Sequence, residues 1–90
     1  MDKTPTKDIE KFYKTIGANV KNKRVAKGLS QLKLSEEMNF KSVGFIGQAE
    51  LYMGKRHFNL LHLYQLASIF ECNIEDFFKD IEIPPKKSEI

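Results

Sequence analysis

Residues 28–54, GLSQLKLSEEMNFKSVGFIGQAELYMG, decide the fold of this chain. They predict two short helices joined by a tight bend. Gly28 is suited to end a preceding helix, and Ser30 is suited to cap the next one, because a serine oxygen accepts a hydrogen bond from a free backbone N–H at a helix start. Leu34 and Met38 follow at the i, i+4 spacing of one buried helix face.

The second helix of this pair is predicted to run from about residue 43 to residue 51, after a bend at 39–41. Ser42 is suited to cap it, and Ile46 and Ala49 would face inward. Two short helices joined in this way are a common means of presenting a helix to the DNA major groove.

Outside this pair, the sequence predicts three more helices and an all-α fold. A helix over about 8–27 has Phe12, Ile16, Val20 and Arg24 along one stripe. Asn59 is a candidate cap for a helix that ends near residue 70 or 71, and Asn73 for a short last helix whose Phe77 would close the core. No segment shows the two-residue alternation of a β-strand.

Length and composition indicate one small globular domain. Ninety residues suffice for one core, and 41% of them are hydrophobic. Cys72 is the only cysteine, so an internal disulfide is impossible and a cytoplasmic location is expected. The chain has no apolar run long enough for a membrane span or a signal segment. We expect a flexible arm at 1–7, a folded domain at 8–80 and a tail at 81–90, which contains a Pro-Pro pair.

Charge is distributed unevenly along the chain. Residues 1–30 hold eight Lys and Arg against three acidic residues, a balance of +5, whereas residues 71–90 hold three Lys against six acidic residues, a balance of −3. The molecule is therefore expected to have a basic pole, which suits phosphate groups, and an acidic pole.

One ordered series of residues runs through most of the chain. It consists of Ile16-Gly17, Val20, Arg24, Gly28-Leu29-Ser30-Gln31, Leu34, Met38, Ile46, Glu50, Gly54-Lys55-Arg56, Leu60, Leu63, Leu66-Ala67 and Asp76-Phe77. This series resembles the repressor-like (Cro/Xre-type) helix-turn-helix family. The resemblance implies a five-helix DNA-binding domain in which helices 2 and 3 form the helix-turn-helix.

The resemblance also implies a structural ion pair between Arg24 and Glu50. Both residues occur on helix stripes that otherwise face the core. A partly buried guanidinium–carboxylate pair can be bidentate, which would fix the angle of the third helix.

The resemblance further assigns DNA contacts to two groups of residues. Gln48 can bond adenine in a bidentate manner, and Val43 can pack on a thymine methyl group. Gly44 and Gly47 present no side chain, so they would either allow close approach of the backbone to DNA or pack against another protein surface. The expected phosphate contacts are Gln31, Lys41, Lys55 and Arg56, and the expected base-edge positions are Ser42, Val43, Gly44, Gly47 and Gln48.

Two loops depart from the family spacing. The bend around Lys41 is about one residue longer, and the stretch Leu51-Tyr52-Met53 about two residues longer. The second departure affects where Lys55 and Arg56 would lie.

The remaining candidates concern self-association and chemistry. A homodimer is expected, and its candidate surface is Leu61, Tyr64, Phe78, Ile81 and Ile83. His57 and His62 lack cysteine or carboxylate partners at metal-ligand spacing, so neither a metal nor another cofactor is expected. The chain also lacks a phosphate-binding loop or a nucleophile motif.

The expected function is a sequence-specific transcriptional regulator that binds double-stranded DNA, most simply a repressor. A stand-alone regulator, an antitoxin-like repressor and a phage-type repressor fit equally well. The alternative is a protein-interaction module that retains this fold and reads DNA weakly or not at all. Catalysis is not expected, and an enzyme is kept only as a third reading because of the lone cysteine and the two histidines.

Overall fold

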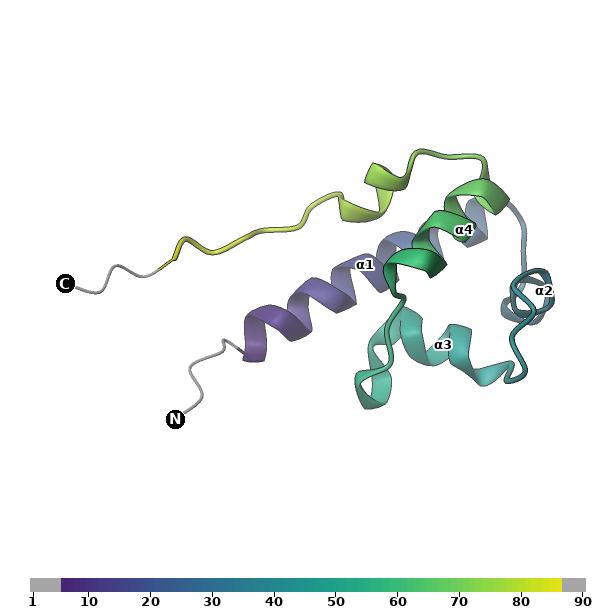
Figure 1. The fold of residues 1–90 in the computed structure, drawn as a ribbon, viewed down its shortest axis with the longest axis horizontal. Helices are drawn as coiled ribbons and strands as arrows, with labels where there is room; N and C mark the ends of the chain where they lie inside the picture. The colour runs from purple at the N-terminus through teal and green to yellow at the C-terminus, as the bar shows by residue number, and fades with distance from the viewer. Residues whose placement is uncertain (1–5, 87–90) are drawn as a thin grey trace.

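The computed structural model describes residues 6–86, and within this range every regular element is helical. The α-helices are α1 (Thr6–Ala26), α2 (Gln31–Glu37), α3 (Gly44–Leu51) and α4 (Leu60–Phe70). Two short 3-10 helices, η1 (Met53–Lys55) and η2 (Ile74–Phe78), precede and follow α4. Figure 1 shows α4 in front of the long α1, with α2 and α3 beside them. The expected all-α class is confirmed for these residues.

The expected fifth α-helix is a short 3-10 helix. Asn73 precedes η2 without a side-chain hydrogen bond to it, and the backbone N–H of Asp76 bonds the carbonyl of Asn73, three residues earlier. By Lys79 the backbone is extended. Five residues provide too few i→i+4 bonds for an α-helix to be maintained.

The ends of α1, α2 and α4 follow from their capping residues. Gly28 has φ +74°, and the N–H groups of Gly28 and Leu29 bond carbonyls of the last turn of α1. The Ser30 oxygen accepts a hydrogen bond from the N–H of Lys33 at 3.0 Å, which caps α2. Asn59 caps α4 in the same way by accepting from the N–H of His62 at 2.7 Å.

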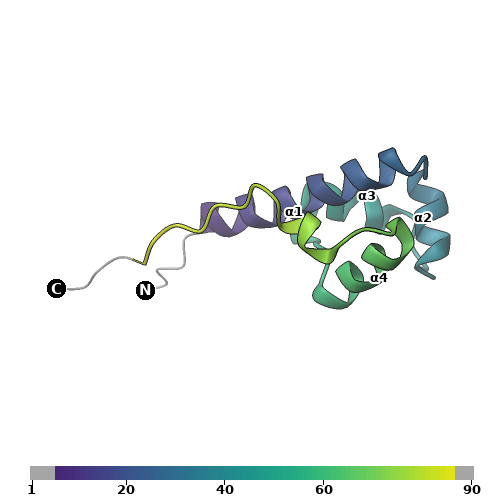
Figure 2. The same cartoon turned by 90° about the horizontal axis from the view of Figure 1, so that it is seen from above.

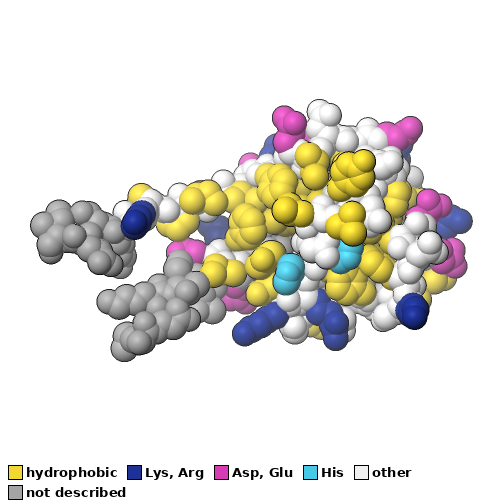
Figure 3. Space-filling model, viewed as in Figure 1, with side chains coloured by type: hydrophobic (Ala, Val, Ile, Leu, Met, Phe, Trp, Pro, Cys, Tyr) yellow, Lys and Arg dark blue, Asp and Glu magenta, His cyan; other side chains and the backbone are white. Residues whose placement is uncertain are grey.

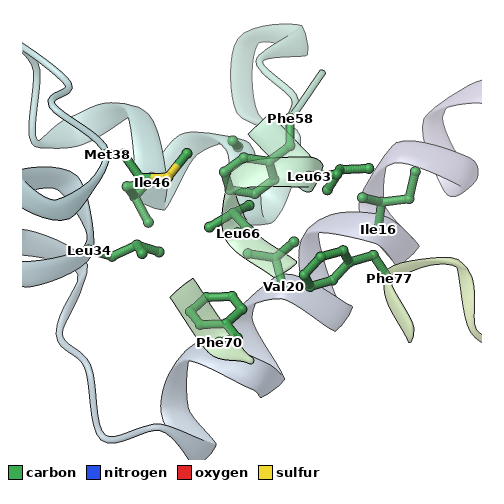
Figure 4. Packing of buried hydrophobic residues seen from close by; sticks show 11 residues of the cluster. Ile16, Val20, Leu34, Met38, Ile46, Phe58, Leu63, Leu66, Phe70 and Phe77 are labelled. Carbon is green, nitrogen blue, oxygen red and sulfur yellow. The ribbon is translucent and has the colours of Figure 1, made fainter. Parts of the chain in front are cut away.

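A single core joins the four α-helices and η2. Figure 4 shows buried side chains from α1, α2, α3, α4 and η2 pointing toward a shared interior. Phe77 is fully buried, so the expectation that it completes the core is confirmed. The core residues are Ile16, Val20, Leu34, Met38, Ile46, Ala49, Phe58, Leu63, Leu66, Phe70 and Phe77.

The last described segment lies along α1. Asn19 donates from Nδ2 to the carbonyl oxygens of Phe77 and Lys79, at 2.9 and 2.8 Å. Farther along, Lys11 and Glu82 form an exposed ion pair at 3.0 Å. Figure 2 shows this extended segment running beside the N-terminal half of α1.

The domain limits differ slightly from the expected ones. The helix α1 begins at Thr6, so residues 6 and 7 of the expected arm are helical. The rest of that arm, residues 1–5, and the end of the expected tail, residues 87–90, lie outside the described residues.

Candidate nucleic-acid interface

The short helices α2 and α3 lie at one end of the molecule and cross at a steep angle. In Figure 1, α2 is seen nearly end-on, whereas α3 lies across the view. The bend between them contains Asn39 with φ +57°, a left-handed conformation that asparagine tolerates better than most residues. The buried residues Leu34 and Ile46 anchor the two helices to the same core.

A buried ion pair fixes α3 to α1. The Nε of Arg24 lies 2.7 Å from Oε2 of Glu50, and its Nη2 lies 3.2 Å from Oε1, so the pair is bidentate. Arg24 is 7% exposed and Glu50 3%. The Nη1 of Arg24 also donates to the carbonyl of Leu29 at 2.8 Å, which ties the start of α2 to the same guanidinium group. The pair expected from the sequence is therefore present, and it positions three helices.

Gln31 is turned toward this ion pair. Its Nε2 donates to Oε1 of Glu50 at 3.1 Å. A Cβ atom at Gly47 would come within 3.1 Å of the Gln31 side-chain oxygen, so the glycine leaves room for this amide. The absence of a side chain at Gly47 thus has a structural explanation inside the protein. Gln31 itself stays largely exposed, and its second amide hydrogen is not used by this bond.

The beginning of α3 is open to solvent. Ser42, Val43 and Gly44 are all exposed, and a Cβ atom at Gly44 would meet only the Ser42 hydroxyl oxygen, at 3.7 Å. The expectation that Ser42 caps α3 is wrong, because Val43 occupies the cap position and no side chain bonds the first turn. The Ser42 carbonyl instead accepts from the buried Ser35 hydroxyl at 3.4 Å. The first N–H groups of α3 are therefore left without a side-chain cap.

The other expected contact residues lie around this exposed start. Lys41 is exposed in the bend before α3, and Gln48 is half-buried one turn after Gly44. Lys55 and Arg56 are both exposed in and just after η1, which follows the far end of α3. The structure thus brings Lys41, Ser42, Val43 and Gly44 together at one end of α3 and places Lys55 and Arg56 near its other end.

An aromatic cluster holds the loop that carries Lys55 and Arg56. The ring of Tyr52 stacks on that of Tyr13 in α1, with centroids 5.2 Å apart, and His57 lies against Tyr13 at 4.2 Å. The His57 Nδ1 donates to the Lys55 carbonyl at 3.0 Å, because that oxygen can only accept. Tyr52 and His57 therefore connect this loop to α1. Sequence reasoning missed this cluster, whose members are distant in the chain and share no periodic pattern.

A second aromatic cluster surrounds His62 in the first turn of α4. Its ring meets those of Phe40, Phe45 and Phe58 edge-on, with centroids 5.2, 5.5 and 6.3 Å away. The His62 Nδ1 accepts a hydrogen bond from the N–H of Asn59 at 3.1 Å, which completes a capping box. Burial, and secondarily the nearby His57, lowers the pKa of His62.

The expected dimer surface is partly exposed. Leu61 and Tyr64 on α4 are 62% and 70% exposed, and Ile83 is 75% exposed. Phe78 is less exposed, at 36%. Ile81 differs from expectation, because it is half-buried and packs against the core, where it helps to hold the last segment on α1.

Chemical sites are sparse in the described part of the chain. Residues 6–86 contain no group of three or more His, Cys, Asp or Glu side chains that could hold a metal ion. Burial raises the pKa of the Cys72 thiol, which makes it a weaker nucleophile. No helix in this range is both long enough and apolar enough to cross a membrane.

Comparisons of this chain with protein-family models, with curated proteins and with solved structures found no match.

Proposed function

We propose that this chain is a DNA-binding transcriptional regulator with a repressor-like helix-turn-helix formed by α2 and α3. The observation that carries the proposal is the bidentate Arg24–Glu50 pair, which fixes α3 to α1 while the start of α3 stays exposed. A helix held rigidly at its buried face and free at its N-terminal end is suited to enter the major groove.

In this proposal, the two ends of α3 have different roles. Val43 and Gln48 contact base edges, and the exposed Ser42 and Gly44 let the backbone approach the groove. Lys41 contacts phosphate at the start of α3, while Lys55 and Arg56 do so beyond its end. Gln31 contributes its second amide hydrogen to a phosphate while the first stays bonded to Glu50.

The regulator acts as a homodimer through the exposed outer face of α4. Leu61 and Tyr64 supply this face, and α4 contains no charged residue that would have to be desolvated. A two-fold arrangement places two recognition helices about 34 Å apart, one turn of DNA.

Selection from a randomised duplex DNA pool tests the proposal. The purified chain is incubated with the pool at low and at physiological salt, and the retained DNA is sequenced. A palindromic motif is the expected result, since a dimer reads two half-sites. Retention of DNA without any enriched sequence, and only at low salt, would contradict a sequence-specific regulator.

Charge variants then test the phosphate contacts. A plot of log affinity against log salt has a negative slope. Each of Lys41→Gln, Lys55→Gln and Arg56→Gln should make this slope less steep by about 0.9, the amount for one neutralised phosphate on duplex DNA. Lys79→Gln is the matched control, because it removes the same charge at the end of η2, far along the chain from α3. An equal effect of the control would show that only net charge matters.

A protein-interaction module remains the second candidate function. The observation that favours it is the small number of side chains at the start of α3 that can discriminate bases, since Gly44 has none and the space at Gly47 is filled by Gln31. Such a module would show little affinity for DNA at any salt concentration, whereas contacts with several phosphates weaken steeply as salt rises.

A further inference from the structure

An open apolar groove lies between α1, the start of α4 and η2. It has a volume of about 340 Å³, within the range of sites that accept a small ligand or a few side chains of a partner. Phe12 and Tyr13 line it from α1, Leu60 and Leu63 from α4, and Phe78 from η2. No Asp, Glu, Lys or Arg is among its lining residues.

The groove is continuous with side chains that the fold leaves uncovered. Leu60 is 73% exposed, although it lies at the first position of α4 and borders the groove. Figure 3 shows hydrophobic side chains gathered across the middle of this face, with histidines among them and Lys and Arg side chains along the lower edge. Contiguous apolar surface of this kind on a small protein marks a site of association.

The rim of the groove is basic on the side of η1. His57 lines the groove, and Lys55 and Arg56 immediately precede it in the chain. Within residues 6–86, neither Lys55 nor Arg56 has an ion-pair partner. Because His57 is held on Tyr13 and bonds the Lys55 carbonyl, this basic loop is fixed beside the apolar floor.

We propose that the groove is the docking site of an acidic, apolar segment of a partner protein, which competes with DNA for Lys55 and Arg56. The competition rests on the proposed function, in which these two residues contact phosphate. Apolar anchors of the segment fill the groove beside Leu60, and its carboxylates neutralise the basic rim. The partner therefore acts as an inhibitor of DNA binding.

Charge complementarity distinguishes this occupant from a second copy of the chain. A two-fold interface pairs the patch with its own copy, and because no Asp or Glu lines the groove, a dimer formed across it would leave Lys55 and Arg56 without carboxylate partners. An acidic segment places opposite charges there instead. The homodimer proposed above uses Leu61 and Tyr64 on the outer face of α4, one residue and one turn away from Leu60.

A peptide selection with matched variants tests the docking site. A displayed library of random short peptides is selected on the wild-type chain, with counter-selection on Leu60→Ser, whose exposed position leaves the core intact. Enriched peptides should combine bulky apolar residues with Asp or Glu. Replacing their acidic residues by Asn and Gln should weaken binding about ten-fold, and the double variant Lys55→Gln with Arg56→Gln should remove this difference.

Leu32→Ser is the matched control, because it removes the same side chain from an exposed position of α2 that does not line the groove. It should leave peptide affinity unchanged, whereas Leu60→Ser should lower it about ten-fold or more. Peptides that bind both variants equally, or that show no preference for acidic residues, would overturn the proposal. So would sedimentation showing that the chain alone forms a dimer that Leu60→Ser dissociates, since the groove would then belong to a second copy.

A competition experiment separates this inference from the function on which it rests. Saturating peptide should weaken binding of the DNA selected above at least ten-fold, while its amide counterpart should not. Simultaneous binding of acidic peptide and DNA without mutual weakening would overturn the competition. A chain that binds the acidic peptide in the groove but no DNA would refute the proposed regulator and leave the docking site established, because the peptide selection uses no DNA.

Discussion

Gly17 permits the close crossing of α1 over α3. A Cβ atom at this position would lie 2.6 Å from the Ala49 carbonyl oxygen and would also collide with the carbonyl of Glu50. Both obstacles are backbone atoms of a helix, so they cannot rotate away as a flexible side chain would. Any residue larger than glycine would therefore push α3 away from α1.

We predict that Gly17→Ala lowers the free energy of unfolding by about 1–3 kcal/mol, the usual cost of overpacking. Gly44→Ala is the control, because a Cβ atom there would make only an ordinary van der Waals contact with Ser42, and the gain in helix propensity should stabilise the chain by up to about 1 kcal/mol. Urea unfolding of both variants measures these changes. A destabilised Gly44→Ala together with a neutral Gly17→Ala would contradict the described crossing.

Arg24 is a second single residue that stabilises the fold, and it does so through its charge. Arg24→Ala leaves the carboxylate of Glu50 buried without its main partner, which typically costs about 3–5 kcal/mol. A domain of this size has a total stability of only about 5–15 kcal/mol, so the variant should unfold at a much lower urea concentration. Replacing both members, Arg24→Met with Glu50→Leu, removes the unpaired charge and should recover most of the loss. Unfolding of Arg24→Ala at the wild-type midpoint would disprove this role.

At the scale of single elements, α4 depends on the protonation of His62. Its Nδ1 accepts a hydrogen bond from Asn59, and only the unprotonated nitrogen can do so. Burial lowers the pKa of this histidine from its usual 6.5. The unfolded chain therefore takes up the proton first as the pH falls.

We predict that this contribution to stability is complete above about pH 6.5 and is lost as the pH falls from there toward the lower native pKa. His62→Gln should remove this part of the pH dependence, since glutamine can form the same capping box without titrating in this range. His57→Gln should retain most of it, because burial is the larger cause of the lowered pKa of His62. Thermal unfolding between pH 5 and 8 provides the measurement, and an unchanged decline in His62→Gln would refute the prediction.

Sequence patterns predict the ends of these helices best where a single side chain caps the helix. Ser30 and Asn59 were identifiable as caps because their side chains act on neighbouring backbone groups. Ser42 does not cap α3, because Val43 occupies the cap position with an already helical backbone and no side chain bonds the first turn. The inward turn of Gln31 and the space left for it by Gly47 could not be predicted, since they depend on how closely α2 approaches α3.

At the scale of the whole molecule, Asn19 joins the two ends of the fold. Its amide donates to the carbonyl oxygens of Phe77 in η2 and of Lys79 just after η2. Removing two such bonds should cost about 1–3 kcal/mol. We predict that Asn19→Ala accelerates amide hydrogen exchange over residues 77–82 more than elsewhere. Asn22→Ala, which alters an exposed asparagine of the same helix, is the control and should leave that exchange unchanged.

The groove is also a property of the whole molecule, and the sequence did not predict it. It combines Tyr13, Leu60 and Phe78, which belong to three separate elements. The sequence did indicate excess apolar surface, through the candidate dimer residues Leu61, Tyr64, Phe78, Ile81 and Ile83. Locating the groove required knowing that η2 packs against both α1 and α4.

The pairing of Lys11 with Glu82 brings the first turns of α1 beside the last described segment. Both therefore lie at the same end of an elongated molecule, away from α2. Domains whose ends are adjacent often tolerate circular permutation. A chain linked end to end and reopened in the exposed bend between α2 and α3 would retain every contact of α1 with α4 and η2, while the connection that orients the two short helices would be severed. Such a permutant would separate the requirements of folding from those of recognition.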